Sequence, residues 1–319
     1  FLDCSRLGRH VIKIYIGALI LGLLLLKLSP TISGVSYYTR YTALIYPTIY
    51  ALWVYANRGK GWAGLLLSMV GAIPLSAILI LAPYTFGLLM FLFIGFVLML
   101  AAAWNNWFGI GRWKSVLPPV LCAGAMVGAM LPYNESFVKR LALALHPEQD
   151  PLGAGYQSLS IRKALSVSQW LGEGTWSSDI SPYPFAWTVP GCDSDGLLTT
   201  LIYKMGYLPF LLIVLVFMAL AACLVHKCLK QKSQLGKAVA GTVVMTLLIQ
   251  ALFSLACTMG YTLFPSSFPL IVGNLNTVVN MGLIGLALSV FRGESITQDI
   301  PCKEDLHPHY RIKVTIQKV

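Results

Sequence analysis

Long apolar runs, separated by short polar connections, dominate this chain. A helix that crosses a bilayer needs about 20 consecutive, mostly apolar residues. Runs that approach this length are residues 11–28, 41–56, 62–82, 86–104, 116–132, 205–225, 238–258 and 268–291. The second run is short and contains Pro47. The pattern predicts an all-α polytopic membrane protein with about eight transmembrane helices.

The composition supports a membrane protein and argues against a soluble one. Hydrophobic residues make up 57% of the chain and charged residues 11%, whereas a soluble domain carries about 25% charged residues. A net charge of +11 could indicate a nucleic-acid partner. The basic residues lie between the apolar runs, however, as topology signals do. We therefore expect membrane lipids, and no nucleic acid, as partners.

Basic residues mark alternate connections between the apolar runs. The short connections between these basic ones are nearly bare, apart from Arg40 at the border of the first. The basic groups are Arg6, Arg9 and Lys13; Arg58 and Lys60; Arg112 and Lys114; Lys227, Lys230, Lys232 and Lys237; and Arg292, Lys303, Arg311, Lys313 and Lys318. Cytoplasmic connections carry the excess of Lys and Arg. The alternation predicts an even number of spans, with both termini of this chain in the cytoplasm.

One connection, residues 133–204 between the fifth and sixth runs, is far longer than the others, and the alternation places it outside the cytoplasm. Long loops between compact elements are usually functional or disordered. This loop is rich in Trp, Tyr and Leu, so we expect it to be ordered against the membrane domain. It holds seven of the twelve acidic residues: Glu135, Glu148, Asp150, Glu173, Asp179, Asp193 and Asp195. The polar residues 293–319 form a predicted cytoplasmic tail.

The long loop carries an ordered series of short motifs. Arg140 precedes an apolar stretch and then His-Pro-Glu-Gln-Asp-Pro at 146–151. Gly-Ala-Gly-Tyr-Gln follows at 153–157, and Gly-Glu-Gly at 172–174. This series resembles the SEDS family of FtsW, RodA and SpoVE proteins, with Glu173 at the place of a family Lys. We expect the two glycines of 153–157 to be turn residues rather than a phosphate cradle.

A second match lies at the end of the loop. Asp195 stands eleven residues before Gly206, at the start of an apolar run. The family has an Asp and a Gly at this spacing, so the resemblance puts Asp195 at the family's essential carboxylate. Asp193 is a neighbour with the wrong spacing. The last run also resembles the family, through Phe-Pro-Leu-Ile at 268–271 and Asn-Met at 280–281.

The family has ten spans, with its large loop between the seventh and eighth. The resemblance therefore implies that residues 1–292 are a SEDS-like transmembrane domain that lacks the first two spans. One departure concerns the family's Pro-Ser-Glu-x-x-Lys segment. The corresponding residues 36–42 contain neither the Glu nor the Lys, and Arg40 is the candidate replacement cation.

The resemblance implies an enzyme of the bacterial cytoplasmic (inner) membrane. SEDS proteins are glycosyltransferases that polymerise lipid II for cell elongation, division or sporulation, together with a class B penicillin-binding protein. A sugar hydroxyl attacks an anomeric carbon, and the lipid pyrophosphate leaves. Asp195 could act as the base or hold a divalent cation such as Mg or Mn. A third possibility is a helix N-cap.

The candidate substrate-binding residues are basic or amide side chains of the loop and the second span. Arginine suits bidentate phosphate binding, although basic residues at an interface also contact anionic lipid headgroups. The candidates are Arg140, Gln157, Arg162, Lys163 and Arg40. Gln157 could bind a sugar or only a loop carbonyl.

Two other functions compete with polymerisation. A non-catalytic SEDS-like scaffold for a penicillin-binding protein is favoured by the missing Glu and Lys, and disfavoured by the retained Asp195 and Gln157. A lipid II flippase would be expected to carry charged groups near the membrane midplane or repeated halves. The sequence shows no clear repeat, and its apolar runs hold almost no charge in their middles.

Overall fold

A computed structural model describes residues 10–28, 30–32, 35–133, 141–153, 155–177, 184–189, 196–264, 266–271 and 275–292. This part of the chain is helical, apart from one pair of two-residue strands, β1 (Thr31–Ile32) and β2 (Val35–Ser36). Helices long and apolar enough to cross a membrane are α2 (Val11–Leu28), α5–α6 (Gly61–Val70 and Ala72–Leu81), α7 (Thr85–Trp104), α13 (Tyr207–Lys230), α14 (Gln234–Thr258) and α15 (Leu275–Arg292). These six candidate spans confirm the predicted all-α polytopic fold. The count of eight stays a prediction.

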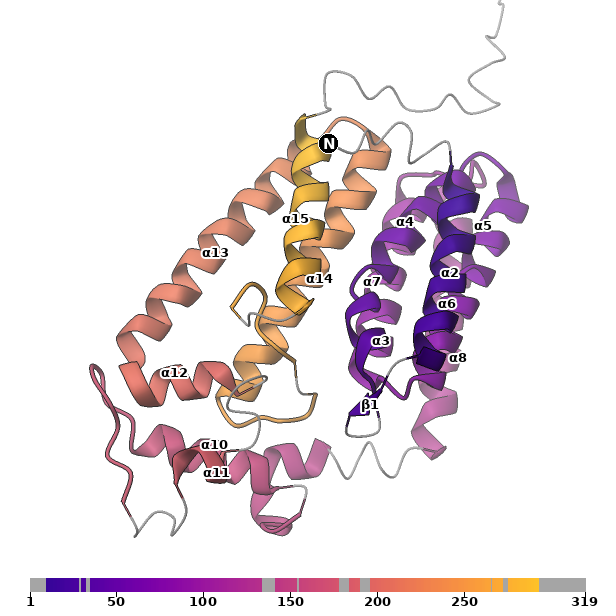
Figure 1. The fold of residues 1–319 in the computed structure, drawn as a ribbon. Helices are drawn as coiled ribbons and strands as arrows, with labels where there is room; N and C mark the ends of the chain where they lie inside the picture. Colours follow the sequence, from indigo (N-terminus) through magenta and orange to yellow (C-terminus); the bar gives the residue numbers. More distant parts are fainter. Residues whose placement is uncertain are drawn as a thin grey trace, which may run out of the picture.

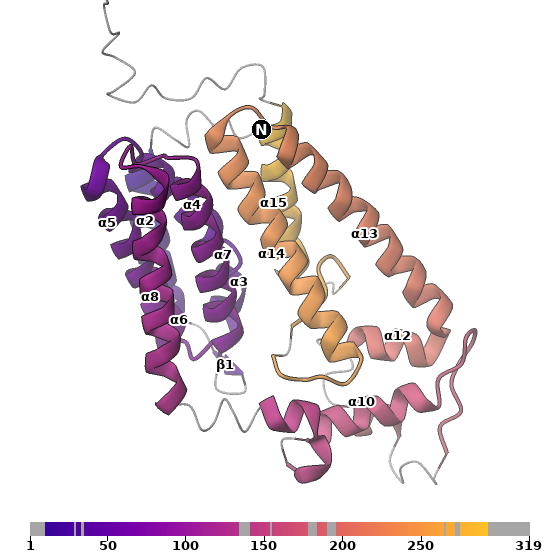
Figure 2. The same cartoon turned by 180° about the vertical axis from the view of Figure 1, so that it is seen from behind.

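The helices form two groups that meet along α14 (Figures 1 and 2). The first group holds α2, α5, α6 and α7 together with α3 (Tyr37–Thr42), α4 (Tyr46–Ala56) and α8 (Arg112–Tyr133). The second group holds α13, α14 and α15. Helix α14 packs against α13 and α15 in its own group and against α4 and α7 across the boundary. The main apolar core contains residues of both groups, so α14 joins them.

Helix α14 carries a buried polar strip. Residues spaced by four lie near one another on a helix face, and every member of the strip is nearly inaccessible to solvent. The strip consists of Thr242, Thr246, Gln250, Ser254 and Thr258. The Thr246 and Thr258 hydroxyls donate to backbone carbonyls four residues earlier, at 2.8 Å each. Small hydroxyl residues let helices approach closely inside a membrane, and these bonds satisfy the hydroxyls of Thr246 and Thr258.

Three predicted spans differ from the structure at their edges. Run 41–56 is interrupted, because α4 begins at Tyr46 with Pro47 in its first turn, where the missing proline N–H costs nothing. The last span begins at Leu275 rather than at residue 268, since residues 266–271 are not helical. The sixth run, 205–225, corresponds to α13, which begins at Tyr207 and continues to Lys230; Gly206 separates it from the short helix α12 (Leu197–Met205).

The two ends of the bundle differ in structure. At the end that we call the loop end, α10 (Tyr156–Ser166) and α12 lie across the spans, with α11 (Phe185–Thr188) beside α10 (Figure 1). At the opposite end, which we call the basic end, α2 begins and α15 ends. Basic residues concentrate in the helix ends and connections there: Lys13, Arg58, Lys60, Arg112, Lys114, Lys227, Lys230, Lys232, Lys237 and Arg292.

The carboxylates within the described ranges all lie at the loop end. They are Glu148, Asp150 and Glu173, in the segment that contains α10. The structure therefore gathers the alternating basic connections on one face and the described carboxylates on the other. This arrangement is what the alternation in the sequence predicts.

Candidate functional site

The motif at 146–157 forms the turn that starts α10. The Asp150 carboxylate accepts a hydrogen bond from the Gly153 N–H at 3.0 Å, and the Gly155 N–H donates to the Asp150 carbonyl at 3.0 Å. A Cβ atom on Gly155 would lie 2.2 Å from the Pro147 carbonyl oxygen, so a side chain does not fit there. Both glycines are turn residues in this structure, as expected from the sequence.

Helix α10 is anchored to the connection that follows α14. The Ser158 and Thr262 hydroxyl oxygens lie 2.6 Å apart, and the Arg162 guanidinium lies over the Tyr261 ring, 5.4 Å from its centroid. At Gly260, where φ is 86°, an added Cβ would lie 2.8 Å from Cγ of Arg162. Arg162 therefore packs against this connection, and its role in phosphate binding stays a prediction.

The eleven-residue spacing between Asp195 and Gly206 corresponds to one helix. Gly196 is the residue before α12, and Gly206 ends it at the corner with α13. Gly206 has φ 96°, a conformation that favours glycine, and an added Cβ would lie 2.6 Å from the Trp170 carbonyl oxygen. The backbone geometry at this corner therefore requires glycine. Asp195 itself lies outside the described residues.

An aromatic cluster holds α12 against α10 and α11. The Tyr203 ring stacks on Phe185 with centroids 4.1 Å apart, and Trp176 meets both rings edge-on. The Tyr203 carbonyl accepts a hydrogen bond from the Gly174 N–H at 2.7 Å. Burial, and secondarily the negative charge of Glu173, raises the pKa of Tyr203. Tyr203 thus acts as a packing residue that joins α12 to α11 and to the segment around Trp176.

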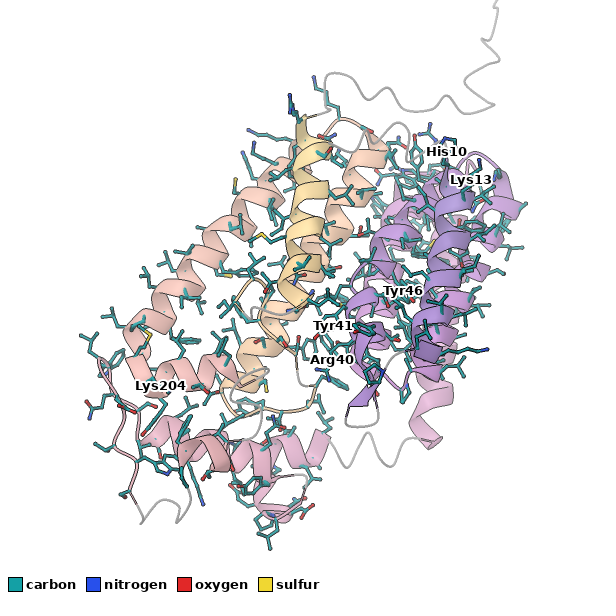
Figure 3. All side chains as sticks on the ribbon, viewed as in Figure 1. His10, Lys13, Arg40, Tyr41, Tyr46 and Lys204 are labelled. Carbon is teal, nitrogen blue, oxygen red and sulfur yellow. The ribbon has the colours of Figure 1, made fainter. Side chains whose placement is uncertain are left out.

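A small polar cavity lies between the two helix groups toward the loop end. Its volume is about 20 Å³, which is room for about one water molecule. Arg40 and Tyr41 of α3 face it from the first group (Figure 3). Leu44, Tyr84 and Phe86 also line it from the first group, and the second group and its connection contribute Gln250, Ser266, Ser267 and Asn276. The Arg40 guanidinium also lies 5.9 Å from the centroid of the Tyr84 ring.

Three amide side chains form a buried network beside this cavity. Gln250 of α14 and Asn280 of α15 exchange two hydrogen bonds, of 3.2 and 3.1 Å. Asn280 also donates to the Asn276 side-chain oxygen at 3.2 Å. All three residues are buried, and the Asn276 side-chain nitrogen has no hydrogen-bond partner among the described residues. An unpartnered buried amide is costly, so this nitrogen, next to the cavity, is available for a bound molecule.

The predicted site residues fall into three sets. Arg40 lines the polar cavity. Gln157 is half-buried in the first turn of α10, and Lys163 is exposed farther along that helix. Arg140 and Asp195 are outside the described residues. Nothing in the described structure brings Gln157 or Lys163 to the cavity.

Sequence reasoning missed the amide network as a site. Asn280 was noticed only as part of the resemblance to the family, and Gln250 and Asn276 were not noticed. A usable signal was present, because polar side chains within apolar membrane runs are expensive and usually functional.

A divalent cation has no set of ligands among the described residues. No group of three or more His, Cys, Asp or Glu side chains lies close together in the parts of the chain that the structure describes. Asp195 therefore stays the predicted candidate ligand for Mg or Mn, and the proposed chemistry does not require a metal.

The fold and the loop-end site define this protein as a polytopic α-helical membrane protein. The chain belongs to the FtsW/RodA/SpoVE family of cell cycle proteins, whose model matches residues 42–295. This match confirms the resemblance seen in the sequence.

Two known proteins are similar to this chain. A probable peptidoglycan glycosyltransferase FtsW from Trichlorobacter lovleyi is 21% identical over 235 residues, which cover 72% of this chain and 58% of that protein. The match thus spans less than two thirds of the relative's length. A chain from a structure of a peptidoglycan synthase complex that coordinates polymerization and crosslinking aligns with a TM-score of 0.70 and 18% identity. This alignment covers 93% of our chain and 85% of that chain, and it shows a shared fold.

Proposed function

We propose that this protein is a lipid II-polymerising glycosyltransferase of the bacterial cytoplasmic membrane, in the hexosyltransferase class. The family match over residues 42–295 is the main support for the proposal, since it includes the loop motifs, Asp195 and the helices α14 and α15 that carry the amide network. The activity in the name of the FtsW relative is in keeping with it.

The loop end supplies groups suited to this chemistry. Asp195 directly precedes Gly196, which is buried and is the residue before α12. The next turn of α12 buries Leu198 and Ile202 in the main core. In our proposal Asp195 accepts the proton of the attacking sugar hydroxyl. Arg40 neutralises charge on the leaving pyrophosphate, and the Asn276 amide donates a hydrogen bond to substrate.

The deciding experiment is polymerisation of labelled lipid II by the full-length protein, reconstituted with its penicillin-binding partner and a divalent cation. We expect glycan strands that a muramidase digests. Absence of strands would favour the scaffold function, which one observation supports: α3 offers Arg40 where the family has Glu and Lys. Movement of lipid II between leaflets without strand formation would instead indicate a flippase.

The proposal places the loop end outside and both termini of this chain in the cytoplasm. Cysteines introduced at Ser177 and Lys114, in a protein without its native cysteines, test this orientation. Both positions are exposed, at the loop end and the basic end respectively. An impermeant thiol reagent added outside should label Ser177→Cys and spare Lys114→Cys. The reverse pattern contradicts the proposal.

The proposed partner is a class B penicillin-binding protein. The solved structure with the same fold comes from a peptidoglycan synthase complex, and family members work with such proteins. Gentle solubilisation of native membranes, followed by purification of this chain, should return a penicillin-binding protein. Its absence at native expression levels would contradict the proposed assembly.

A further inference from the structure

A second, larger cavity opens at the basic end, between α7 and α14. Its volume is about 380 Å³, within the range of about 300–1,000 Å³ that is typical of small-molecule sites. The wall from α7 is apolar, with Ile94, Leu98 and Ala101, and α14 contributes Ala238 and Met245. The cavity lies at the opposite end of the bundle from Arg40 and the amide network, so it is separate from the proposed catalytic site.

Two lysines stand at this cavity. Lys232 lies in the connection between α13 and α14, and Lys237 in the first turn of α14, and both are exposed. Asn105, just after α7, adds an exposed amide to the lining. Among the described residues the carboxylates all belong to the segment 141–177 at the loop end. The described part of the chain thus offers these lysines no carboxylate partner.

The position of Lys237 is unfavourable for its own helix. The first turn of α14 contains no acidic residue, and the helix dipole places positive potential where Lys237 adds a positive charge. A bound anion would offset both. The ligand must therefore combine a negative group at the mouth with an apolar portion that fills the wall between α7 and α14.

We propose that this cavity binds one anionic phospholipid. Its phosphate lies between Lys232 and Lys237, and part of an acyl chain lies against Leu98, Ala101 and Met245. Basic pockets between membrane helices on the cytoplasmic side are suited to such headgroups. Because the lipid contacts α7 and α14, it bridges the two helix groups. This site does not depend on the proposed polymerase activity.

The test uses phosphatidylglycerol with a photoreactive group in one acyl chain, mixed with the full-length protein in neutral-lipid nanodiscs. We expect cross-links in residues 94–107 and 238–245. The double variant Lys232→Gln/Lys237→Gln should reduce them at least about tenfold, because each lysine contributes about a factor of five to anionic lipid binding. The matched control Lys227→Gln/Lys230→Gln removes two exposed lysines of the same end that do not line the cavity. It should leave these cross-links nearly unchanged.

A third variant separates shape from charge. Ala101→Trp keeps both lysines but fills the cavity from a lining position, and it should also remove the cross-links. If Lys232→Gln/Lys237→Gln and the matched control Lys227→Gln/Lys230→Gln lose the cross-links equally, the proposal is overturned in favour of general attraction between the lipid and the basic surface. Equal cross-linking of a phosphatidylcholine probe would overturn the charge selection. Cross-links that form only after deletion of residues 293–319 would show that the tail, and not a lipid, occupies the site.

Discussion

At the loop end, helices α10 and α12 cross over the spans, and the cavity between the two helix groups has a volume of only about 20 Å³. At the basic end, no described helix crosses the spans, and the cavity between α7 and α14 has a volume of about 380 Å³. The lining of the small cavity includes an arginine, hydroxyls and amides beside Leu44 and Phe86, whereas the large one has an apolar wall with two lysines.

The difference separates two ways of recognising a molecule. Buried amides with fixed partners select by hydrogen-bond geometry, because an unmatched polar group inside is costly. Exposed lysines beside an apolar wall select a molecule by its negative charge and its acyl chain, and they impose little constraint on hydrogen-bond geometry. Under the two proposals above, the loop end would discriminate among substrates and the basic end would hold an abundant lipid. The proposed polymerase activity also requires the loop-end cavity, at about 20 Å³, to widen before a molecule as large as lipid II can enter.

The largest effect is expected at Asp195. Asp195→Asn should lower lipid II polymerisation by about 10²–10⁴-fold, because it removes the proposed base while keeping a side-chain oxygen that can cap a helix. Insertion and folding should be preserved, and they are measured by the yield and unfolding temperature of the purified protein.

Asp193→Asn is the matched control for this change. It makes the same chemical change two residues away, at the wrong distance from Gly206, and should keep near-normal activity. Normal polymerisation by Asp195→Asn would falsify the assignment of the base. An inactive Asp193→Asn with an active Asp195→Asn would show that the alignment to the family is off by two residues.

The next effect concerns the corner between α12 and α13. Gly206→Ala should lower the free energy of unfolding by about 2–4 kcal/mol, because its φ of 96° disfavours a side chain and the new Cβ would overlap the Trp170 carbonyl. Gly282→Ala in α15 is the control, since nothing lies within 4 Å of its Cβ position. Denaturation in detergent micelles measures both, and equal stability of the two variants would contradict the described corner.

A smaller loss is expected in the amide network. Asn280→Ala leaves both polar atoms of the Gln250 amide without their present partner and should cost about 1–2 kcal/mol. Asn276→Leu should cost less, because its nitrogen is already unpartnered among the described residues and the Gln250–Asn280 pair remains. The same denaturation experiment compares them. A larger loss for Asn276→Leu would mean that the network is paired differently.

The smallest effect is expected where α10 packs against the connection after α14. Arg162→Leu removes the contact with the Tyr261 ring and should cost about 0.5–1 kcal/mol. The measurable result is faster hydrogen exchange in α10 and in the connection after α14. Lys163→Leu, at an exposed neighbouring position, should leave the exchange unchanged. Similar exchange in both variants would show that Arg162 does not anchor α10.

Much of the fold could be predicted because an apolar run long enough to cross a bilayer rarely occurs outside a membrane-spanning helix. The first run even matches α2 at both ends. The breaks were harder to predict. Pro47 looked like a weakness in a span but marks the first turn of α4, and the non-helical residues 266–271 are as apolar as a helix edge. Hydropathy measures only the preference for lipid, and it does not report where the backbone turns.

The candidate site could be predicted only where its interactions join residues that are close in the sequence. The turn at Asp150 and Gly153 and the spacing to Gly206 depend on neighbours, and they could be recognised in a motif. The pairing of Gln250 with Asn280 depends on how α14 packs against α15, and the cavity at the basic end depends on how α14 packs against α7. A single sequence does not specify these packings, so both features required the structure.

The polar strip on α14 has a consequence for the biogenesis of the protein. As this helix leaves the ribosome and enters the bilayer, the Gln250 amide faces an environment without hydrogen-bond partners, which is costly. Its partner Asn280 is synthesised 30 residues later. Helices α14 and α15 should therefore partition into the membrane as a hairpin, with α14 retained near the translocon until α15 emerges. Truncation of the nascent chain between residues 258 and 275 should leave α14 poorly inserted.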